Sequence, residues 1–325
     1  MNITLENKPT PSALSAKENL EYAVIVGPTA GGKSQLAFDL ASVLPIEIIN
    51  CDSTQVYRGF DIGSAKATKE EQARVPHHML DLVSWSENYD ACRYRDQARV
   101  TIKEVRSRGK IPLLVGGTGL YLRAVWGYDF HDFPKDETLR EQLTHLTNVQ
   151  IQEKLFALDP ARARELHIHD RFRLIRACEI AILTGQTRAE SIRQQELSLC
   201  PPALLIMCQP AKDDLDLRIK VRTKKLLEAD ALIEETFQLL HKQDDPCPRM
   251  AKPMQTIGYK QVSQFLAGEL GRDELEPRMV IATRQYAKRQ MTWFKKLNCD
   301  MILTNGPSFK NEFNGLEEKI TKVFC

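Results

Sequence analysis

The chain alternates short apolar runs with longer stretches in which apolar and polar positions recur at helical spacing. Four of the short runs consist mostly of aliphatic and β-branched residues, which is typical of strands buried in a parallel sheet. These runs lie at 22–27, 46–52, 111–117 and 203–208. Helical patterns separate them, for example over 91–108, and the alternation predicts an α/β fold in which helices flank a parallel sheet.

The strand pattern stops between 128 and 198, where the sequence is polar, charged and helical in spacing. The clearest helix in this stretch covers 171–185 and ends at Gly185. Residues 212–297 also have a mainly helical pattern. We therefore expect three parts: a flexible tail over 1–20, an α/β core formed by 21–127 with 199–325, and a helical insertion domain over 128–198.

Charge and cysteine content narrow the class of protein. In 325 residues, 45 Lys and Arg stand against 43 Asp and Glu, so the net charge of +2 neither requires nor excludes nucleic acid. The eight cysteines form no CxxC pair, which argues against a zinc site and a disulfide framework. The first twenty residues do not resemble a signal peptide, and no apolar stretch is long enough to span a bilayer. We therefore expect a cytoplasmic protein without a membrane anchor.

The most specific motif is GPTAGGKS at 27–34, which matches the P-loop pattern and stands between a predicted strand and a predicted helix. Its glycines let backbone N–H groups point at phosphate oxygens, and the helix start adds a positive dipole end. The Ser34 hydroxyl suits Mg²⁺. A chance glycine-rich turn is the alternative, and the default ligand of such a loop is a nucleotide. The predicted phosphate-binding residues are Gly27, Pro28, Thr29, Ala30, Gly31, Gly32, Lys33 and Ser34.

Two further candidates follow predicted strands. Asp52 ends the second strand, at the edge where doubly wound sheets bind ligands, so its carboxylate could be a Mg²⁺ partner or a general base. Thr118 follows the two glycines that end the third strand and offers a hydroxyl at the start of a helix. Both have a structural alternative, because Asp often turns the chain after a strand and Thr often caps a helix.

Basic residues share one face of the predicted helix that follows the fourth strand. Arg218, Arg222 and Lys225 are spaced by four and three residues. An apolar stripe accompanies them, made of Ile219, Leu226 and Ile233. A charge row of this kind is usually a solvated surface, although guanidinium groups could also reach a diphosphate.

Two other predicted helices carry basic rows. Arg284, Lys288 and Lys295 share one face of the helix at 282–296. A second face of that helix is more typical of protein core and holds Tyr286, Trp293 and Leu297. In the insertion, Arg173 and Arg176 also share a face. Rows of cations on several helices fit a surface that binds a phosphate backbone.

Seven segments, in this order, resemble the tRNA dimethylallyltransferase (tRNA isopentenyltransferase) family, in its shorter bacterial type. The pairing of DSxQVYxGxDIGxAK with VGGTxLY makes the resemblance specific, and it extends from about residue 22 to about residue 297. The segments are GPTAGGKS (27–34), DSTQVYRGFDIGSAK (52–66), PHHMLDLV (76–83), LVGGTGLYLRA (114–124), RFRLIRACEI (171–180), QTIGYKQ (255–261) and ATRQYAKRQMTWFK (282–295).

The resemblance implies a P-loop NTPase-like fold and a prenyl transfer. Dimethylallyl diphosphate would donate its dimethylallyl group to the N6 amine of the adenosine immediately 3′ of the anticodon in tRNA. The P-loop then holds the donor's diphosphate rather than ATP, and Mg²⁺, Arg218 and Arg222 help to balance the charge of the leaving group. Asp52 matches the family's catalytic aspartate, which takes the N6 proton, and Thr118 matches a substrate-contacting threonine.

The resemblance also implies contacts with the tRNA anticodon stem-loop. The tRNA-binding residues that it implies are Asp52, Ser53, Thr54, Gln55, Thr118, Arg140, Phe172, Arg173, Leu174, Ile175, Arg176, Ile257, Gly258, Tyr259, Lys260, Gln261, Arg284, Gln285, Lys288 and Arg289. We expect the protein to act as a monomer. A small-molecule P-loop kinase and a non-catalytic RNA-binding module stay open as alternatives, although a kinase does not need basic rows on three helices, and a module without catalysis does not need Lys33 and Asp52.

Overall fold

The computed structural model describes residues 20–127, 133–193, 203–304 and 309–325. The predicted tail, apart from residue 20, therefore lies outside the described residues. The chain divides into two compact units. One is formed by 1–126 with 200–325 and the other by 127–199.

The first unit is built on a parallel sheet of six strands in the order β3-β2-β4-β1-β5-β6. The strands are β1 (Tyr22–Val26), β2 (Ile46–Asn50), β3 (His77–His78), β4 (Ile111–Gly116), β5 (Ala203–Cys208) and β6 (Met301–Leu303). Four of them confirm the strands predicted from the apolar runs. The two outer strands, β3 and β6, were not predicted, because two or three residues are too few to show a strand pattern.

Helices cover both faces of this sheet. On one face, α1 (Lys33–Ala41) and α14 (Phe309–Phe324) share a core with alternate residues of the strands, such as Ile25 and Leu113. On the other side, α3 (Ala91–Ser107) packs against β2, β4 and α4 (Gly119–Val125). The short helix α2 (Lys69–Arg74) precedes β3. This arrangement leaves the carboxyl ends of β1, β2 and β4 together at one edge of the sheet.

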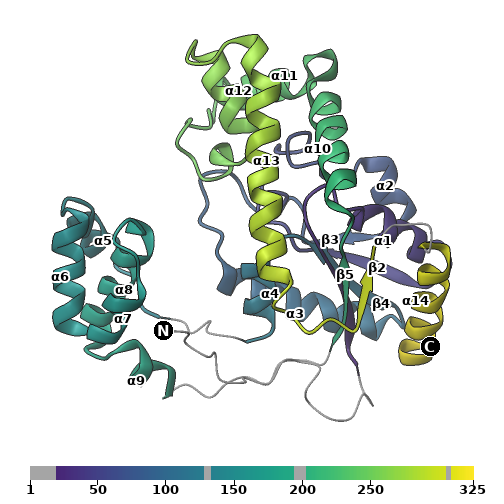
Figure 1. The fold of residues 1–325 in the computed structure, drawn as a ribbon, viewed down its shortest axis with the longest axis horizontal. Helices are drawn as coiled ribbons and strands as arrows, with labels where there is room; N and C mark the ends of the chain where they lie inside the picture. Colours follow the sequence, from purple (N-terminus) through teal and green to yellow (C-terminus); the bar gives the residue numbers. More distant parts are fainter. Residues whose placement is uncertain (1–19, 128–132, 194–202, 305–308) are drawn as a thin grey trace. The chain divides into compact units, whose positions relative to one another are not determined.

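Four helices beyond β5 complete the first unit. They are α10 (Lys212–Leu227), α11 (Ala231–Leu240), α12 (Tyr259–Leu266) and α13 (Arg272–Phe294), with short 3₁₀ turns at Glu228–Asp230 and Pro253–Gln255. The long helix α13 packs against α10 and α12 and reaches α4 beside the sheet (Figure 1). The prediction that Ile219, Leu226 and Ile233 form one stripe on a single helix is wrong. Ala229 and Asp230 have positive φ and interrupt the helix, so Ile233 lies on α11 and not on α10.

The second unit is helical in its described part. Its helices are α5 (Glu137–Thr144), α6 (Asn148–Leu158), α7 (Pro160–Glu165), α8 (Arg171–Thr184) and α9 (Arg188–Arg193). Leu143, Ile151, Leu155 and Leu174 form its own apolar core. A separate core of this kind allows the unit to be considered as a domain by itself. In the described parts of both units, no helix is long and apolar enough to cross a membrane.

Candidate active site

The P-loop joins β1 to α1 through backbone that only glycine adopts easily. Gly32 has a φ of 89° at the N-cap of α1, so a side chain there would be strained. At Gly27 the chain passes so close to β5 that an added Cβ would lie 2.6 Å from the carbonyl oxygen of Cys208. The Gly31 N–H donates to the Pro28 carbonyl at 3.0 Å and closes the turn. The loop therefore has the shape that the GPTAGGKS motif predicts.

Lys33 begins α1 and folds back under this loop. Its Nζ donates to the carbonyl oxygens of Gly27 at 3.0 Å and Pro28 at 2.7 Å. The pKa of Lys33 is lowered to about 8, mainly by burial and also by the nearby Arg222, although Cys208 and Asp52 act to raise it. The next residue, Ser34, is exposed. Lys33 therefore loses its proton at a lower pH than an exposed lysine does, and a bound anion would favour its charged form.

Helix α10 carries the predicted guanidinium row, and its members differ. Arg222 lines a cavity beside the loop, and burial lowers its pKa while Asp52 raises it. Arg218 forms an ion pair with Asp214 at 3.2 Å on its own helix. Lys225 is exposed and does not line the cavity. Of the three residues of the row, Arg222 therefore lines the cavity, and Arg218 and Lys225 do not.

Asp52 follows β2 and is held by the turn that it starts. Its Oδ1 accepts hydrogen bonds from the N–H groups of Thr54 at 2.8 Å and Gln55 at 3.4 Å. From the adjacent strand end, Thr118 Oγ1 accepts from the Ser53 N–H at 3.1 Å. The structural alternative for Asp52 is thus confirmed, and it coexists with a carboxylate that lines the cavity. The two strand ends are joined through Ser53 and Thr118.

Tyr286 comes from α13 to the same place, although the sequence placed it on a core face. It lines the cavity with Asp52. Burial and the Asp52 carboxylate raise the pKa of Tyr286 to about 12, whereas a hydrogen bond with Thr118 lowers it. The guanidinium of Arg289 lies 5.8 Å from the centre of the Tyr286 ring. The helix therefore brings a phenol and a cation to the acidic end of β2.

These groups surround one cavity of about 270 Å³ in the first unit. Thr29 and Arg222 contribute phosphate-binding chemistry, and Asp52 contributes a carboxylate. Apolar side chains also line it, namely Leu226, Ile257 and Met279. A cavity with a few converging polar groups and an apolar wall fits a small ligand that has a charged end and a hydrocarbon end.

A second network shapes the wall of this cavity. Tyr259 is buried, and its hydroxyl donates to Glu235 and accepts from the Gly63 N–H at 3.1 Å. The Glu235 carboxylate also accepts from the N–H groups of Asp61, Ile62 and Gly63. In the predicted segment 257–261, Ile257 faces the cavity, Lys260 is exposed, and the Gln261 side chain accepts from the Gly258 N–H at 2.9 Å. Part of this segment therefore organises the wall.

Gln290 on α13 joins two loops of the site, a role that the sequence analysis did not predict. Its Oε1 accepts from the Thr29 N–H of the P-loop at 2.8 Å. Its Nε2 donates to the Gly117 carbonyl at 3.0 Å, one residue before Thr118. One signal was present in the sequence: Gln290 lies four residues after Tyr286 and three before Trp293, so it is a polar residue on the face expected to be core.

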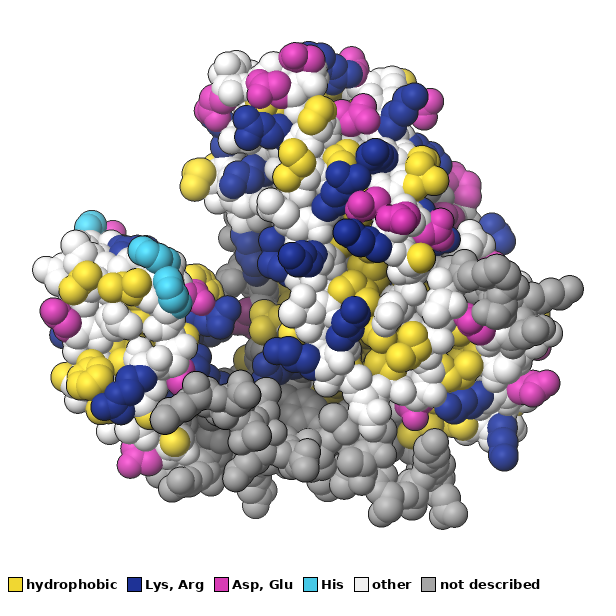
Figure 2. Space-filling model, viewed as in Figure 1, with side chains coloured by type: hydrophobic (Ala, Val, Ile, Leu, Met, Phe, Trp, Pro, Cys, Tyr) yellow, Lys and Arg dark blue, Asp and Glu magenta, His cyan; other side chains and the backbone are white. Residues whose placement is uncertain are grey.

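The surface of α13 carries the cations predicted to bind tRNA. Figure 2 shows Lys and Arg side chains gathered over α10 and α13. Gln285, Lys288 and Arg289 are exposed, whereas Arg284 forms an ion pair with Asp216 of α10 at 3.1 Å. The row therefore includes both available cations and one that is already paired.

In the insertion, the residues predicted to bind tRNA differ in exposure, and some of them are buried or paired with a buried carboxylate. Phe172 is 81% exposed, and Arg173 is paired only at the surface, with Asp170. The side chains of Leu174 and Ile175 are buried in the core of the unit. Arg140 and Arg176 pair at 2.8 and 2.6 Å with Glu179, a carboxylate with no exposed side-chain surface.

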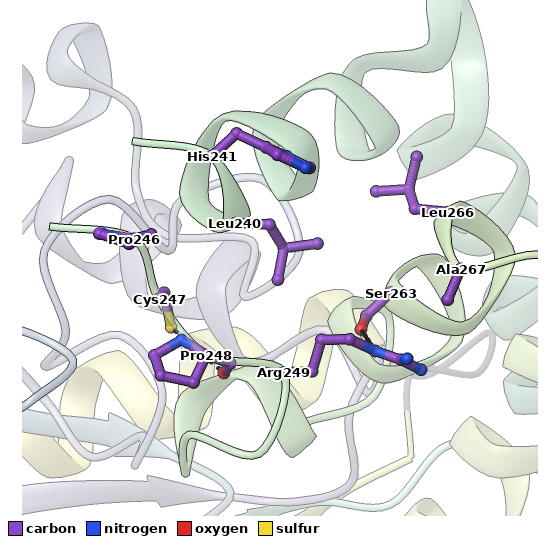
Figure 3. A pocket seen from close by; sticks show the side chains of 9 residues that line it. All are labelled: Leu240, His241, Pro246, Cys247, Pro248, Arg249, Ser263, Leu266 and Ala267. Carbon is purple, nitrogen blue, oxygen red and sulfur yellow. Dashed lines mark hydrogen bonds between the residues drawn. The ribbon is translucent and has the colours of Figure 1, made fainter. Parts of the chain in front are cut away.

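A larger hollow of about 420 Å³ lies elsewhere in the first unit, between the end of α11, the segment 246–249 and α12 (Figure 3). Arg249 lines it but is already engaged, because its Nε donates to Ser263 Oγ at 3.0 Å and it pairs with Glu269 at 2.8 Å. Cys247 is buried there, and burial raises its pKa to about 12. None of the predicted site residues lines this hollow, so the cavity beside the P-loop is the candidate site.

Comparison with known proteins gives consistent results. The family model for IPP transferase matches residues 55–297. A tRNA dimethylallyltransferase of Geobacter sulfurreducens is 40% identical over 286 residues, which cover 86% of this chain and 91% of that protein. The solved tRNA isopentenylpyrophosphate transferase of Bacillus halodurans has a TM-score of 0.67 at 34% identity, over 94% of this chain and 97% of that chain. A solved eukaryotic dimethylallyltransferase, described as acting on tRNA, has a TM-score of 0.77 at 30% identity, over 92% and 77%. These matches confirm the resemblance, and the chain belongs to the IPP transferase family.

Proposed function

We propose that the protein transfers a dimethylallyl group from dimethylallyl diphosphate to the N6 amine of the adenosine immediately 3′ of the anticodon in tRNA, giving N6-dimethylallyladenosine. Membership of the family and the names of its relatives support a prenyl transfer to tRNA. The structural observation that carries the proposal is the single cavity lined by the P-loop residue Thr29, by Arg222 and by Asp52. It brings a diphosphate-binding loop within reach of a carboxylate and an apolar wall.

The donor's diphosphate fits the P-loop side of this cavity. The backbone N–H groups at the start of α1 lie beside Lys33, whose Nζ is held by the carbonyl oxygens of Gly27 and Pro28, and the Arg222 guanidinium lines the cavity. Groups arranged in this way stabilise negative charge that develops on a leaving group. The dimethylallyl chain would lie against the apolar wall, which includes Leu226 and Met279.

The transfer is a displacement at the allylic carbon. The N6 lone pair forms the new C–N bond while the C–O bond breaks, and its electron pair leaves with diphosphate. Asp52 accepts the N6 proton, which keeps the product neutral. Because two backbone N–H groups hold Oδ1 of Asp52, the direction of the carboxylate is set by the turn at 52–55.

Mg²⁺ is part of this proposal. Within the described residues, no cluster of three or more His, Cys, Asp or Glu side chains could hold a metal. Mg²⁺ does not require such a cluster, because it binds through one or two protein oxygens, substrate phosphates and water. The exposed Ser34 hydroxyl, beside Lys33 at the start of α1, would hold the ion, and Mg²⁺ would neutralise charge on the diphosphate.

The target adenine must leave its stack to reach a cavity of this kind. The exposed cations of α13 and Arg173 of the insertion are the residues that we propose to contact tRNA phosphates. A cytoplasmic monomer is the form that we propose for the active protein.

The test is incubation of the protein with dimethylallyl diphosphate, Mg²⁺ and unmodified tRNA, followed by mass spectrometry of the tRNA nucleosides. We expect N6-dimethylallyladenosine to appear only when all components are present. A parallel competition experiment compares ATP with dimethylallyl diphosphate. Tight ATP binding that the prenyl diphosphate does not displace, together with unmodified tRNA, would favour the kinase alternative.

A further inference from the structure

The Gln290 carboxamide bridges two loops that come from different strands. It accepts from the Thr29 N–H at 2.8 Å and donates to the Gly117 carbonyl at 3.0 Å, and the side chain is buried. Thr29 belongs to the P-loop after β1, whereas Gly117 belongs to the turn after β4. The two partners lie 261 and 173 residues away along the chain, so the bridge exists only in the folded protein.

The chain around Gln290 is shaped for this one side chain. An added Cβ at Gly117 would lie 2.2 Å from the Gln290 Nε2, which leaves no space for a larger residue at 117 while Gln290 is present. A glutamate at 290 would retain the acceptor for Thr29 but would place a second oxygen against the Gly117 carbonyl. An asparagine is one methylene shorter and cannot span both partners. The site therefore requires the donor, the acceptor and the length of glutamine.

The two loops that Gln290 joins hold the two halves of the proposed reaction. The P-loop holds the leaving diphosphate, and Thr118, next to Gly117, fixes Ser53 beside Asp52. We propose that Gln290 is a positioning residue that sets the distance between the diphosphate loop and the residues that receive the adenine. This inference rests on the proposed function, because only a reaction between two substrates needs that distance to be fixed.

Substitution of Gln290 tests the inference by a split between kcat and KM. In Gln290→Ala and Gln290→Glu we expect the single-turnover rate of prenyl transfer to fall about 10–100-fold, since small displacements of reacting groups cost up to about 10² in rate. The KM for dimethylallyl diphosphate should rise several-fold at most, and tRNA affinity should stay at the parent value. A fall in rate that a higher donor concentration restores would overturn the inference.

A matched control separates positioning from loss of stability. Glu47 is also buried, and it holds Arg108 and His78 near the start of β2, at the opposite end of the strand from Asp52. Glu47→Gln should lower the melting temperature without changing the single-turnover rate at a temperature where the variant is folded. If Glu47→Gln and Gln290→Ala lower the rate equally at equal stability, Gln290 has only a structural role.

A double-mutant cycle tests the geometry directly. Gly117 does not have a positive φ, so Gly117→Ala is hindered mainly by the Gln290 side chain. We expect Gly117→Ala alone to slow transfer strongly, and to add little further loss in the Gln290→Ala background, because truncation makes room for the new methyl group. Fully additive losses would contradict the contact that the inference requires.

Hydrogen exchange gives a readout that does not depend on prenyl transfer. In Gln290→Ala the segment 27–32 should exchange faster than in the parent protein, and in Glu47→Gln it should not. If the parent transfers no prenyl group but this difference is observed, the proposed function fails while the bridge stands. If the parent is active and the exchange of 27–32 does not change in Gln290→Ala, the positioning role is wrong.

Discussion

The P-loop site and the basic helix of the insertion hold their cations in opposite ways. At the P-loop, Arg222 lines the cavity and Lys33 donates to the carbonyl oxygens of Gly27 and Pro28. Burial lowers the pKa of both cations. In the insertion, Arg140 and Arg176 converge on the buried carboxylate of Glu179. Burial raises the pKa of Glu179, but hydrogen bonds from both guanidinium groups outweigh this effect and the net shift is downward. The sequence shows basic residues at helical spacing in both places, and only the partner tells whether a cation is available to a ligand.

The largest effect expected from this comparison is at the P-loop site. Asp52→Asn should lower turnover by about 10²–10⁴-fold, the usual range for general acid–base catalysis. An asparagine retains the Oδ1 acceptor for the N–H groups of Thr54 and Gln55, so the turn and the binding of both substrates should be preserved. Single-turnover kinetics with saturating donor and tRNA measures the change. Turnover close to that of the parent would remove Asp52 from the role of base.

Arg176 and Arg173 provide a matched pair in the insertion. Arg176→Ala leaves Glu179 buried with one guanidinium fewer, so we expect the unfolding free energy of the unit to fall by about 2–3 kcal/mol, below the range for a fully buried pair because Arg176 is partly exposed. Arg173→Ala should change it by less than about 0.5 kcal/mol, because Arg173 is 66% exposed and its loss leaves Asp170 in contact with water. Hydrogen exchange within α8 reports both values. Equal losses in the two variants would contradict the division between cations that pair with a buried carboxylate and cations that pair at the surface.

The features that could be predicted from the sequence are those that depend on residues close together in the chain. The strands β1, β2, β4 and β5 have enough apolar residues to show their burial, and the spacing of GPTAGGKS indicates the P-loop. Asp52 could be predicted because the carboxyl end of a parallel strand is where ligands bind. These features depend on neighbouring residues, which a sequence displays directly.

Contacts between distant segments could not be predicted in the same way. In the sequence, Gln290 is a polar residue of a basic helix, and only the fold shows that its Oε1 and Nε2 bind Thr29 and Gly117. In the sequence, Glu179 is one of several charged residues of a helix, and only the fold shows that it is buried and paired with Arg140 and Arg176. In each case the role depends on which groups are desolvated together, and this is a property of tertiary packing.

The pH dependence of diphosphate binding sharpens the comparison from the P-loop side. Lys33 has a pKa of about 8, so it is mostly protonated below that pH and loses its charge as the pH rises. We expect the affinity for inorganic diphosphate to fall above about pH 8, by up to about tenfold per pH unit. Calorimetry at constant ionic strength measures the diphosphate affinity at each pH. Methionine has no ionisable group, so the pH profile of Lys33→Met shows the effect of the ligand's own ionisation. A profile equal to that of Lys33→Met would show that the charge of Lys33 does not contribute.

The smallest effect concerns tRNA binding by Arg173, an exposed cation of the insertion that pairs with Asp170 at 3.0 Å. Arg173 is 66% exposed, so a contact with a tRNA phosphate would release one counterion when it forms. Arg173→Ala should therefore lower the log–log salt slope of anticodon stem-loop binding by about 0.7–0.9. Lys154→Ala is the matched control, because Lys154 is an exposed cation of the same unit that no motif assigns to tRNA. Binding at several salt concentrations measures both slopes. If both variants retain the parent slope, the exposed face of α8 does not contact the RNA backbone. If both variants lower the slope equally, cations of this unit act through its overall electrostatic field and not through a defined contact.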